Sequence, residues 1–263
     1  MSAATMEALR WLSDATLIIG ASRGIGFALA VASAERRTTV ATVRDSAGAT
    51  ALRKANPSIR VMTMDVANDA AIQLLKMQLL KSGIRVNLLI HNAGINTGSY
   101  TQQRLVNAEA PFRLLNILML SPPAAILSKR SDRRVCVITS ELGNDELARR
   151  MRRKHGLQCE RSRTTAEANS CAYVITKQEA NAAFRYNAPS WALKGIVAAA
   201  IHPGFVATAM SGYTYANGTQ RKTLSRGIIT AHAAAVGILQ VCGNLSRAQH
   251  GSALDWRGKS WQW

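Results

Sequence analysis

The chain has 263 residues, of which 48% are apolar, 18% charged and 5% aromatic. This composition excludes a disordered chain, and the length suits one large domain with a substantial core. Lys and Arg number 33 against 15 Asp and Glu, and the resulting net charge of +18 indicates an anionic partner, surface, substrate or cofactor.

No apolar run reaches the roughly 18 residues of a membrane span, and charged residues before Thr16 argue against a signal peptide. The four cysteines contain no CxxC pair and match no zinc-ligand spacing. In a chain long enough to fold without disulfide staples, we interpret them as reduced thiols. The sequence therefore predicts a cytoplasmic protein with no metal and no membrane partner.

Short β-rich apolar runs alternate with helical patterns along the chain, which is typical of a parallel sheet built from βαβ units. The run 86–90 is uninterrupted, as expected for a strand with both faces covered. Strands are expected at 16–19, 40–43, 61–64, 86–90, 135–139 and 196–201, and helices at 25–34, 70–81, 101–120 and 173–186. This order predicts an α/β, single-domain Rossmann fold over residues 1–263, a doubly wound parallel sheet with helices on both faces.

Residues 149–163 interrupt this alternation with seven Arg or Lys and one acidic residue. They lie between a strand and a helix, where a compact fold normally has a short loop, and we treat about 143–168 as a basic insert. The insert lacks a nucleic-acid-reading motif and aromatic interleaving, so no nucleic-acid partner is expected. Residues 209–226 are the expected substrate lid, and Tyr100, Tyr213 and Tyr215 are candidates for stacking on an aromatic substrate.

A glycine-rich turn with the pattern G-x-x-x-G-x-G follows the first strand and opens a helix. Glycines let the backbone approach a pyrophosphate, and the helix N-terminus supplies free N–H groups and a positive dipole. The position between a strand and a helix is the context that this motif requires. The nucleotide-binding candidates in the turn are Gly20, Ser22, Arg23, Gly24, Ile25 and Gly26.

The end of the second strand indicates which dinucleotide binds. A carboxylate there accepts a hydrogen bond from the ribose 2′-hydroxyl of NAD, whereas an arginine pairs with the 2′-phosphate of NADP. Arg44 occupies this position, and Arg23 adds a second cation on the same side, although the adjacent Asp45 keeps NAD open as an alternative. We therefore expect NADP(H) to be preferred over NAD(H).

Tyr173 and Lys177 are four residues apart on a predicted helix and share one face. The ammonium group is expected to stabilise the phenolate and to lower the pKa of Tyr173 from its usual value of about 10. Ser140 ends a parallel strand, where such sheets place their active-site groups. Its hydroxyl can donate to a carbonyl oxygen that gains negative charge.

These residues occur in the order found in the short-chain dehydrogenase/reductase family, which the sequence resembles over nearly its whole length. The matching segments are Gly20–Gly26, Asp65-Val66, Asn92-Ala93-Gly94, Asn107, Ser140, Tyr173-x-x-x-Lys177 and Pro203-Gly204-Phe205-Val206-Ala207-Thr208. The resemblance implies a nicotinamide cofactor and the reduction or oxidation of a substrate carbonyl or alcohol.

The resemblance also implies roles for individual residues. Tyr173 would donate a proton to the carbonyl, Lys177 would hold the nicotinamide ribose, and Ser140 would orient the carbonyl oxygen. Asn107 would hold a water that connects Lys177 to solvent. Further cofactor contacts would come from Asp65 and Val66 beside the adenine, Asn92, Ala93 and Gly94 along the cofactor cleft, and Pro203, Gly204, Val206 and Thr208, the last near the carboxamide.

One of these roles also has an argument from the residues themselves. Pro111 follows Asn107 by four residues and cannot donate to the Asn107 carbonyl. We therefore expect a distorted helix here, with a backbone acceptor left for a water. The alternative is that Pro111 marks a helix start.

The sequence also departs from the family pattern. Ile19 stands where the family often has threonine, which removes a local hydrogen bond. Ser140 and Tyr173 are 33 residues apart, a longer interval than in many members. This insertion resembles the carbonyl reductases, and the tail Asp255-Trp256-x-Gly258-x-x-Trp261 resembles a subgroup of carbonyl reductases and C-factor-like proteins.

The sequence is compatible with three functions. The leading hypothesis is an NADPH-dependent oxidoreductase that reduces a ketone or aldehyde, taken as a small-molecule carbonyl substrate. The alternatives are a 3-oxoacyl-carrier-protein-type reductase, whose acidic partner a basic surface would attract, and a non-catalytic, nucleotide-sensing regulatory member of the same fold.

The sequence leaves the choice between monomer and homo-oligomer undecided. The resemblance implies pairing through the helices that carry Asn107 and Tyr173. The basic insert lies close to that surface and could cover it, and two copies of the insert would repel each other across a two-fold axis.

Overall fold

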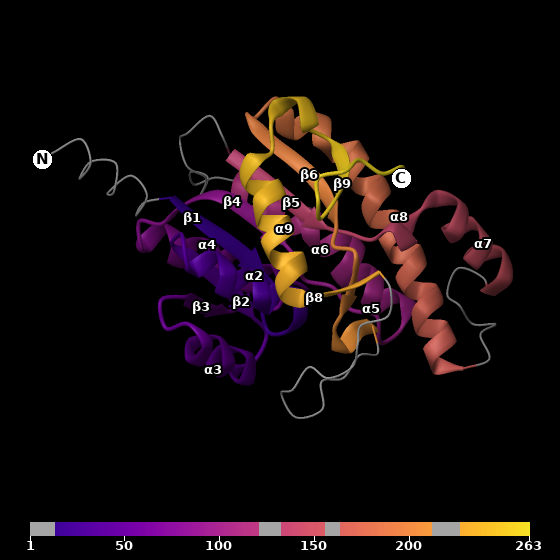
Figure 1. Ribbon diagram of the computed structural model, residues 1–263, viewed down its shortest axis with the longest axis horizontal. Coiled ribbons are helices and arrows are strands. Elements are labelled where there is room, and N and C mark those ends of the chain that lie inside the picture. The colour runs from indigo at the N-terminus through magenta and orange to yellow at the C-terminus, as the bar shows by residue number, and fades with distance from the viewer. Residues whose placement is uncertain (1–13, 121–132, 156–163, 212–226) are drawn as a thin grey trace, which may run out of the picture.

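The computed structural model describes residues 14–120, 133–155, 164–211 and 227–263. These residues build a seven-stranded parallel sheet in the order β3-β2-β1-β4-β5-β6-β9 (Figure 1). Its strands are β1 (Asp14–Ile19), β2 (Thr39–Val43), β3 (Arg60–Thr63), β4 (Arg85–His91), β5 (Arg133–Ile138), β6 (Ile196–His202) and β9 (Ser252–Asp255). A second, two-stranded parallel sheet joins β7 (Phe205–Ala207) to β8 (Ile228–Thr230).

Helices cover both faces of the large sheet (Figure 1). The α-helices are α2 (Gly24–Ala34), α3 (Ser46–Ala55), α4 (Asp69–Lys81), α5 (Tyr100–Arg104), α6 (Ala110–Leu115), α7 (Asp145–His155), α8 (Thr165–Ala192) and α9 (Ala231–Asn244). Two π-helical segments, η1 (Leu105–Glu109) and η2 (Asn116–Leu120), flank α6, and short 3₁₀ turns form η3 (Glu141–Gly143), η4 (Ala209–Ser211) and η5 (Arg247–Gln249). One apolar cluster lies under α4, α6 and α8, and the other lies under α2, α3 and α9.

Local sequence explains where several helices begin. Asp45, Asn68, Thr164 and Thr230 each accept a hydrogen bond from a backbone N–H in the first turn of α3, α4, α8 and α9. All five residues of β2 are buried, as a strand covered on both faces requires. The capping side chains therefore fix where these helices begin, and the buried strand forms part of the core that the helices cover.

The expected Rossmann architecture is confirmed, and each of the six predicted strands is present. The predicted helix 101–120 is helical but is interrupted by η1, which contains Asn107. The π-helical segment agrees with the distorted helix expected near Asn107, while Pro111 itself lies in the first turn of α6, as the alternative of a helix start predicts. Helices α3 and α9 and strand β9 were not predicted.

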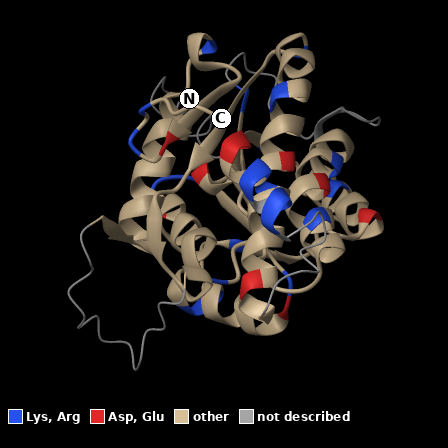
Figure 2. Cartoon of the chain, turned by 90° about the vertical axis from the view of Figure 1, so that its right-hand side faces the viewer, with Lys and Arg blue, Asp and Glu red and all other residues tan. Residues whose placement is uncertain are grey.

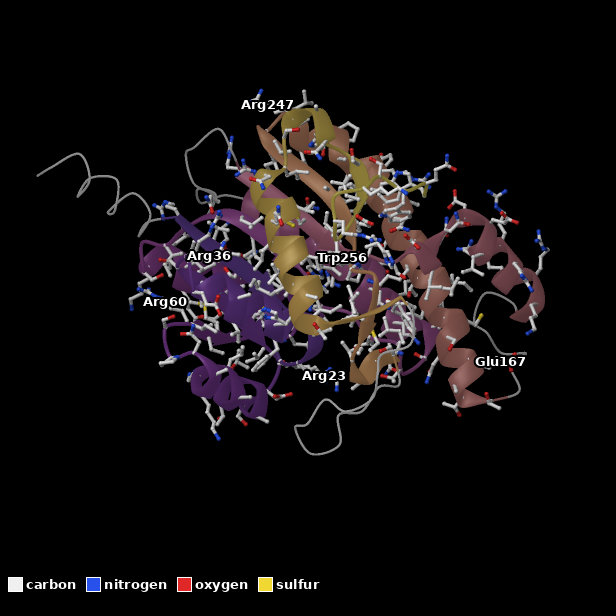
Figure 3. All side chains as sticks on the ribbon, viewed as in Figure 1. Arg23, Arg36, Arg60, Glu167, Arg247 and Trp256 are labelled. Carbon is white, nitrogen blue, oxygen red and sulfur yellow. The ribbon has the colours of Figure 1, made fainter. Side chains whose placement is uncertain are left out.

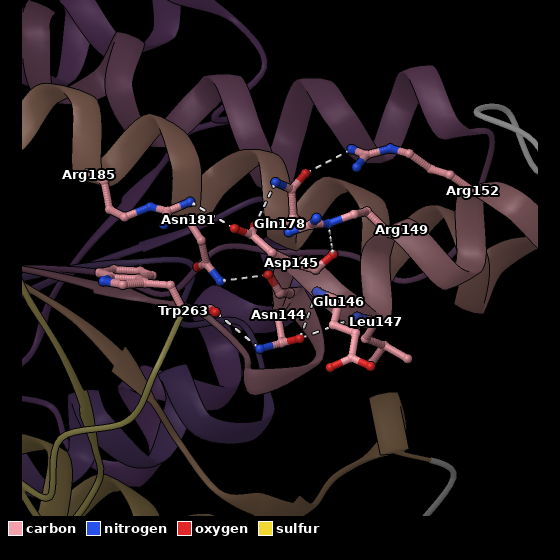
Figure 4. Close-up of polar contacts among 11 residues, drawn as sticks. Asn144, Asp145, Glu146, Leu147, Arg149, Arg152, Gln178, Asn181, Arg185 and Trp263 are labelled. Atoms are coloured by element: carbon pink, nitrogen blue, oxygen red, sulfur yellow. Dashed lines mark hydrogen bonds and ion pairs between the residues drawn. The ribbon is translucent and has the colours of Figure 1, made fainter.

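The insert begins as a helix, not as a loop. Helix α7 lies along α8 (Figure 4). Gln178 of α8 donates to Asp145 Oδ1 at 2.9 Å and accepts from Arg152 at 2.8 Å, so that one amide contacts α7 at its first residue and two turns further along. Arg185 adds an ion pair of 3.5 Å to Asp145. Residues 156–163 of the insert and 212–226 of the expected lid lie outside the described residues.

The cysteines do not share one state. Cys136 and Cys242 are free and buried, as predicted. Cys171 is disulfide-bonded, so the interpretation of all four cysteines as reduced thiols is wrong for this residue. The length argument considered only whether the fold needs a staple, and a disulfide can form wherever two thiols come close enough.

Charge on the helices is mixed in sign. Figure 2, in which the right-hand side of Figure 1 faces the viewer, shows Lys and Arg beside Asp and Glu on neighbouring helices. On α8, Glu179 accepts from Tyr100 and lies 3.7 Å from Arg104 and 3.9 Å from Arg152.

Within the described part of the chain, no helix is long and apolar enough to cross a membrane.

We expect the intact protein to sediment as a monomer, because α7 already occupies one side of α8. A variant with residues 145–165 shortened would remove α7 from Gln178 and is expected to self-associate. Sedimentation velocity at matched concentrations and near 0.15 M salt, where charges beyond about 8 Å are screened, tests this. The same oligomer in both proteins would show that the insert does not control assembly.

Candidate active site

The turn after β1 is held so close to the chain after β4 that Gly20 and Gly26 have no room for a side chain. Gly20 has a φ of +84°, and a Cβ added there would lie 2.7 to 2.8 Å from atoms of Ala93. A Cβ on Gly26 would overlap the carbonyl oxygen of Gly20. Asn92 Nδ2 donates to that same oxygen at 2.7 Å. The glycine pattern thus packs the start of α2 directly against the carboxyl edge of the sheet.

The N-terminus of α2 is open toward the turn. Arg23 is the N-cap residue, its side chain makes no capping hydrogen bond, and the first turn of α2 has no acidic residue. Figure 3 labels Arg23 and Arg36, at the two ends of this helix. Unpaired N–H groups and a positive helix dipole, next to glycines that leave space for an approaching group, fit the pyrophosphate of a dinucleotide.

The missing family threonine at position 19 has a substitute in space. The N–H of Gly20 donates to Thr42 Oγ1 on β2 at 3.0 Å, and the N–H of Ala21 donates to the Thr42 carbonyl at 2.7 Å. Thr42 lies one strand away, so the hydrogen bond that Ile19 cannot provide is supplied across the sheet. The glycine motif alone does not identify Thr42, because this residue is distant from the motif in sequence.

Arg44 and Asp45, which compete in the sequence for the nucleotide ribose, have different surroundings. Asp45 Oδ1 accepts from the Gly48 N–H at 2.8 Å and caps α3. The Arg44 side chain is exposed, and its backbone N–H donates to Ser22 Oγ at 3.3 Å. The carboxylate is therefore engaged with α3, while the backbone of Arg44 is joined to the glycine turn.

The remaining nucleotide candidates line the same edge. Asp65 follows β3 and accepts from the Ala67 N–H at 2.9 Å, and Val66 is buried. A Cβ on Gly94 would lie 3.3 Å from Asn107 Oδ1 and 3.7 Å from Lys177 Nζ.

The Pro203–Thr208 segment reaches the glycine turn from the other side of the sheet edge. The methyl group of Thr208 lies 3.4 Å from where a Cβ on Gly24 would be. Val206 is buried in β7, and Trp256 (labelled in Figure 3) lies 3.0 Å from where a Cβ on Gly204 would be.

Asn107 links three elements. Its amide accepts from the Ile95 N–H and donates to the Ile95 carbonyl, both at 2.8 Å, and it also donates to Thr176 Oγ1 at 3.1 Å. The π-helical turn η1 places this side chain between the chain after β4 and helix α8. Thr176, next to Lys177, was not singled out in the sequence, because a lone threonine in a helix carries no signal.

Ser140 and Tyr173, which are 33 residues apart in sequence, meet in space. Ser140 caps η3 by accepting from the Leu142 N–H at 3.1 Å, and its side chain forms a hydrogen bond with Tyr173. Gly143 makes this approach possible, since a Cβ there would lie 2.6 Å from the backbone of Lys177. Ser140, Tyr173, Lys177 and Asn107 therefore form one cluster at the carboxyl edge, beside the glycine turn.

The electrostatics of this cluster differ from the expectation. Burial raises the pKa of Tyr173 to about 12, and the hydrogen bond with Ser140 only partly opposes this. Burial also lowers the pKa of Lys177 to about 8. The Lys177 Nζ lies 5.7 Å from the centre of the Tyr173 ring and donates to the Ile138 carbonyl at 3.2 Å. Desolvation thus outweighs the effect of the ammonium on the phenol that the sequence suggested.

Two other expectations concern substrate and metal. Tyr100 donates to Glu179 at 2.6 Å and packs on Cys171 and Ile175, so its ring is fixed against α8. Tyr213 and Tyr215 lie outside the described residues.

Among the residues that the structure describes, no group of three or more His, Cys, Asp or Glu could hold a metal ion.

The chain belongs to the short chain dehydrogenase family, whose model matches residues 14–148. This half of the chain contains the glycine turn, Asn107 and Ser140. No curated protein sequence shows significant similarity to the chain.

Solved structures share the fold over almost the whole length. NADPH-bound carbonyl reductase from chicken fatty liver is 22% identical, covers 95% of this chain and 94% of its own, and gives a TM-score of 0.71. Carbonyl reductase Sniffer of D. melanogaster is 19% identical, with coverages of 96% and 100% and a TM-score of 0.70. A Burkholderia multivorans protein with bound NADP, described as a short-chain dehydrogenase/reductase, is 23% identical, with coverages of 95% and 100% and a TM-score of 0.68.

The packing of the glycine turn leads to a first prediction for the site. Gly26→Ala should weaken NADPH binding at least tenfold, about 1.4 kcal/mol, because the new methyl group would force Gly20 away from Asn92. Fluorescence titration with NADPH measures this.

A matched control is Gly243→Ala in α9, where the nearest atom to a new Cβ is 3.7 Å away. It should leave binding unchanged and keep or raise the melting temperature, because alanine favours a helix. Equal affinity of Gly26→Ala and the native protein would mean that the turn does not hold the nucleotide.

Proposed function

We propose that this short-chain dehydrogenase is an NADPH-dependent oxidoreductase that reduces a ketone or aldehyde to an alcohol. The observation that carries the proposal is the cluster of Ser140, Tyr173, Lys177 and Asn107 beside an open helix N-terminus. Carbonyl reductases among the solved structures of the same fold support this choice of reaction.

In the proposed mechanism, the nicotinamide cofactor, when bound, supplies the hydride that reduces the carbonyl carbon. The Ser140 hydroxyl orients the carbonyl oxygen, and the Tyr173 phenol transfers its proton to that oxygen as the alcohol forms. Because the pKa of Tyr173 is raised to about 12, the phenol keeps its proton at neutral pH until the substrate oxygen becomes basic. The Lys177 ammonium then stabilises the phenolate until a proton returns from solvent.

Lys177 and the glycine turn would hold the two ends of the cofactor. The Lys177 ammonium lies beside Gly94, on the edge that continues to the turn. Asn107 keeps this segment in place through Ile95 and Thr176. At the other end, the exposed Arg44 is the candidate for the 2′-phosphate of NADP, since Asp45 is engaged as the cap of α3.

Tyr173→Phe should lower kcat by at least about 100-fold, the low end of the effect of general acid catalysis, while NADPH still binds. NADPH oxidation with a panel of simple ketones and aldehydes measures this. Tyr186→Phe is the matched control, because Tyr186 lies on the same helix and is 86% exposed.

Full activity of Tyr173→Phe would exclude the proposed mechanism. If the native protein binds NADPH but oxidises it with none of these carbonyls, the non-catalytic, nucleotide-sensing alternative is favoured. An assay with a 3-oxoacyl thioester on a carrier protein tests the remaining alternative.

Arg44→Asp should weaken NADPH binding far more than NADH binding, by about 1.5–3 kcal/mol, the contribution of a hydrogen bond to a charged group. Titration with both cofactors measures the difference. Arg60→Asp makes the same change of charge at the first residue of β3, at the opposite edge of the sheet, and should affect both cofactors little. Equal losses for NADPH and NADH in Arg44→Asp would mean that Arg44 does not contact the 2′-phosphate.

A further inference from the structure

Asn181 is a buried amide on α8 whose two ends bind residues on either side of Ser140. The residue is 1% exposed. Its Oδ1 accepts from the hydroxyl of Thr139, which is also buried, and its Nδ2 donates to the Gly143 carbonyl at 3.2 Å (Figure 4). Thr139 directly precedes Ser140, and Gly143 follows in the 3₁₀ turn that Ser140 caps. One side chain therefore spans the turn that carries the serine of the proposed mechanism.

The chemistry of its partners fixes the orientation of the Asn181 amide. A backbone carbonyl can only accept a hydrogen bond, so the NH₂ group of the amide must face Gly143. The amide oxygen then faces Thr139, whose hydroxyl must be the donor. A flip of the amide would set oxygen against oxygen at Gly143. Because all three groups are buried, water cannot replace a lost partner, and the side chain has one stable orientation.

Asn181 lies one helical turn after Lys177, and residues at this spacing share a face of the helix. Lys177 donates to the Ile138 carbonyl at 3.2 Å, and Asn181 binds the next residue, Thr139. The end of β5 is thus joined to α8 at two consecutive residues. The turn after it is joined at Gly143, where a Cβ would lie 2.6 Å from the backbone of Lys177.

A further contact of this turn is longer and exposed to solvent. The Glu141 N–H donates to His202 Nδ1 at 3.4 Å, near the limit of a hydrogen bond. An exposed N–H that loses its partner can bind water, whereas a buried group that loses its partner stays unsatisfied. We therefore expect the position of Ser140 to depend on Asn181 more than on His202.

We propose that Asn181 is a positioning residue for Ser140. By holding the residues on both sides of the serine, its amide fixes the Ser140 hydroxyl relative to Tyr173, which lies on the same helix. The consequence for catalysis rests on the function proposed above. A carbonyl oxygen that must accept from both hydroxyls tolerates little displacement of either, so a turn that moves away from α8 slows the chemical step. Binding of the cofactor, which depends on the glycine turn, stays unchanged.

The test removes the amide or one of its partners and measures carbonyl reduction. Asn181→Leu has nearly the shape of asparagine but forms neither hydrogen bond. Thr139→Val removes only the hydroxyl and serves as a second variant should the leucine prevent folding, whereas Thr139→Ser keeps a hydroxyl. Asn187→Leu is the matched control, because Asn187 also lies on α8 and donates to the Ala183 carbonyl of its own helix at 2.8 Å.

Asn181→Leu and Thr139→Val should each lower kcat at least about tenfold, the effect of one buried hydrogen bond on the barrier, with NADPH affinity unchanged. Thr139→Ser and Asn187→Leu should keep kcat within about twofold of the native value. In a Ser140→Ala protein, adding Asn181→Leu should change kcat by less than about twofold, because an absent hydroxyl cannot be displaced. A merely structural role would lower kcat by the same factor with and without Ser140, and that result overturns the inference.

Amide hydrogen exchange at Gly143 is the second measurement, and it needs no activity. The Gly143 N–H donates to the Ser140 carbonyl at 3.0 Å inside the turn. In Asn181→Leu it should exchange at least about tenfold faster, as expected for a turn that opens locally. Faster exchange in a protein that reduces no carbonyl supports the inference on Asn181 and rejects the proposed function. Native exchange at Gly143 in both Asn181→Leu and Thr139→Val overturns the inference, whatever the activity.

Discussion

The close approach of two chain segments at the carboxyl edge of the sheet fixes the geometry of the whole site. The turn after β1 lies against Ala93, and Asn92 and Thr42 bind its backbone from β4 and β2. This contact sets where α2 begins and where the chain leaves β4 toward Asn107. Because a Cβ at Gly20 or Gly26 would clash there, backbone packs directly on backbone at this edge of the sheet.

The cluster of Ser140, Tyr173, Lys177 and Asn107 depends on a second close approach. Gly143 lets η3 pack on the backbone of Lys177, which brings Ser140 to Tyr173 across 33 residues of intervening chain. The same burial that creates this contact also raises the pKa of the phenol and lowers that of the ammonium. A site that positions its groups by packing must therefore support their charged forms with dipoles, such as the Ile138 carbonyl that accepts from Lys177.

The C-terminal tail holds the outer part of the cluster in place. The Trp263 carbonyl accepts from Asn144 at 3.1 Å, and the Trp263 ring packs on Phe184 of α8 and Arg185. Asn144 lies between η3 and α7, so the tail ties the start of the insert to the helix that carries Tyr173 and Lys177. The start of the insert is thereby joined to helix α8 through Trp263.

The sequence by itself determined the six strands that are β1 to β6, four of the helices that cover them, the glycine turn and the identity of the clustered residues. Each of these depends on short-range patterns: apolar runs, glycines at fixed spacing, and a proline that distorts the helix at Asn107. Tertiary structure alone decided the engagement of Asp45 with α3, the substitution of Thr42 for a missing threonine, the direction of the Tyr173 pKa and the disulfide of Cys171. These depend on burial and on contacts between residues distant in sequence, and neither quantity is encoded in local spacing.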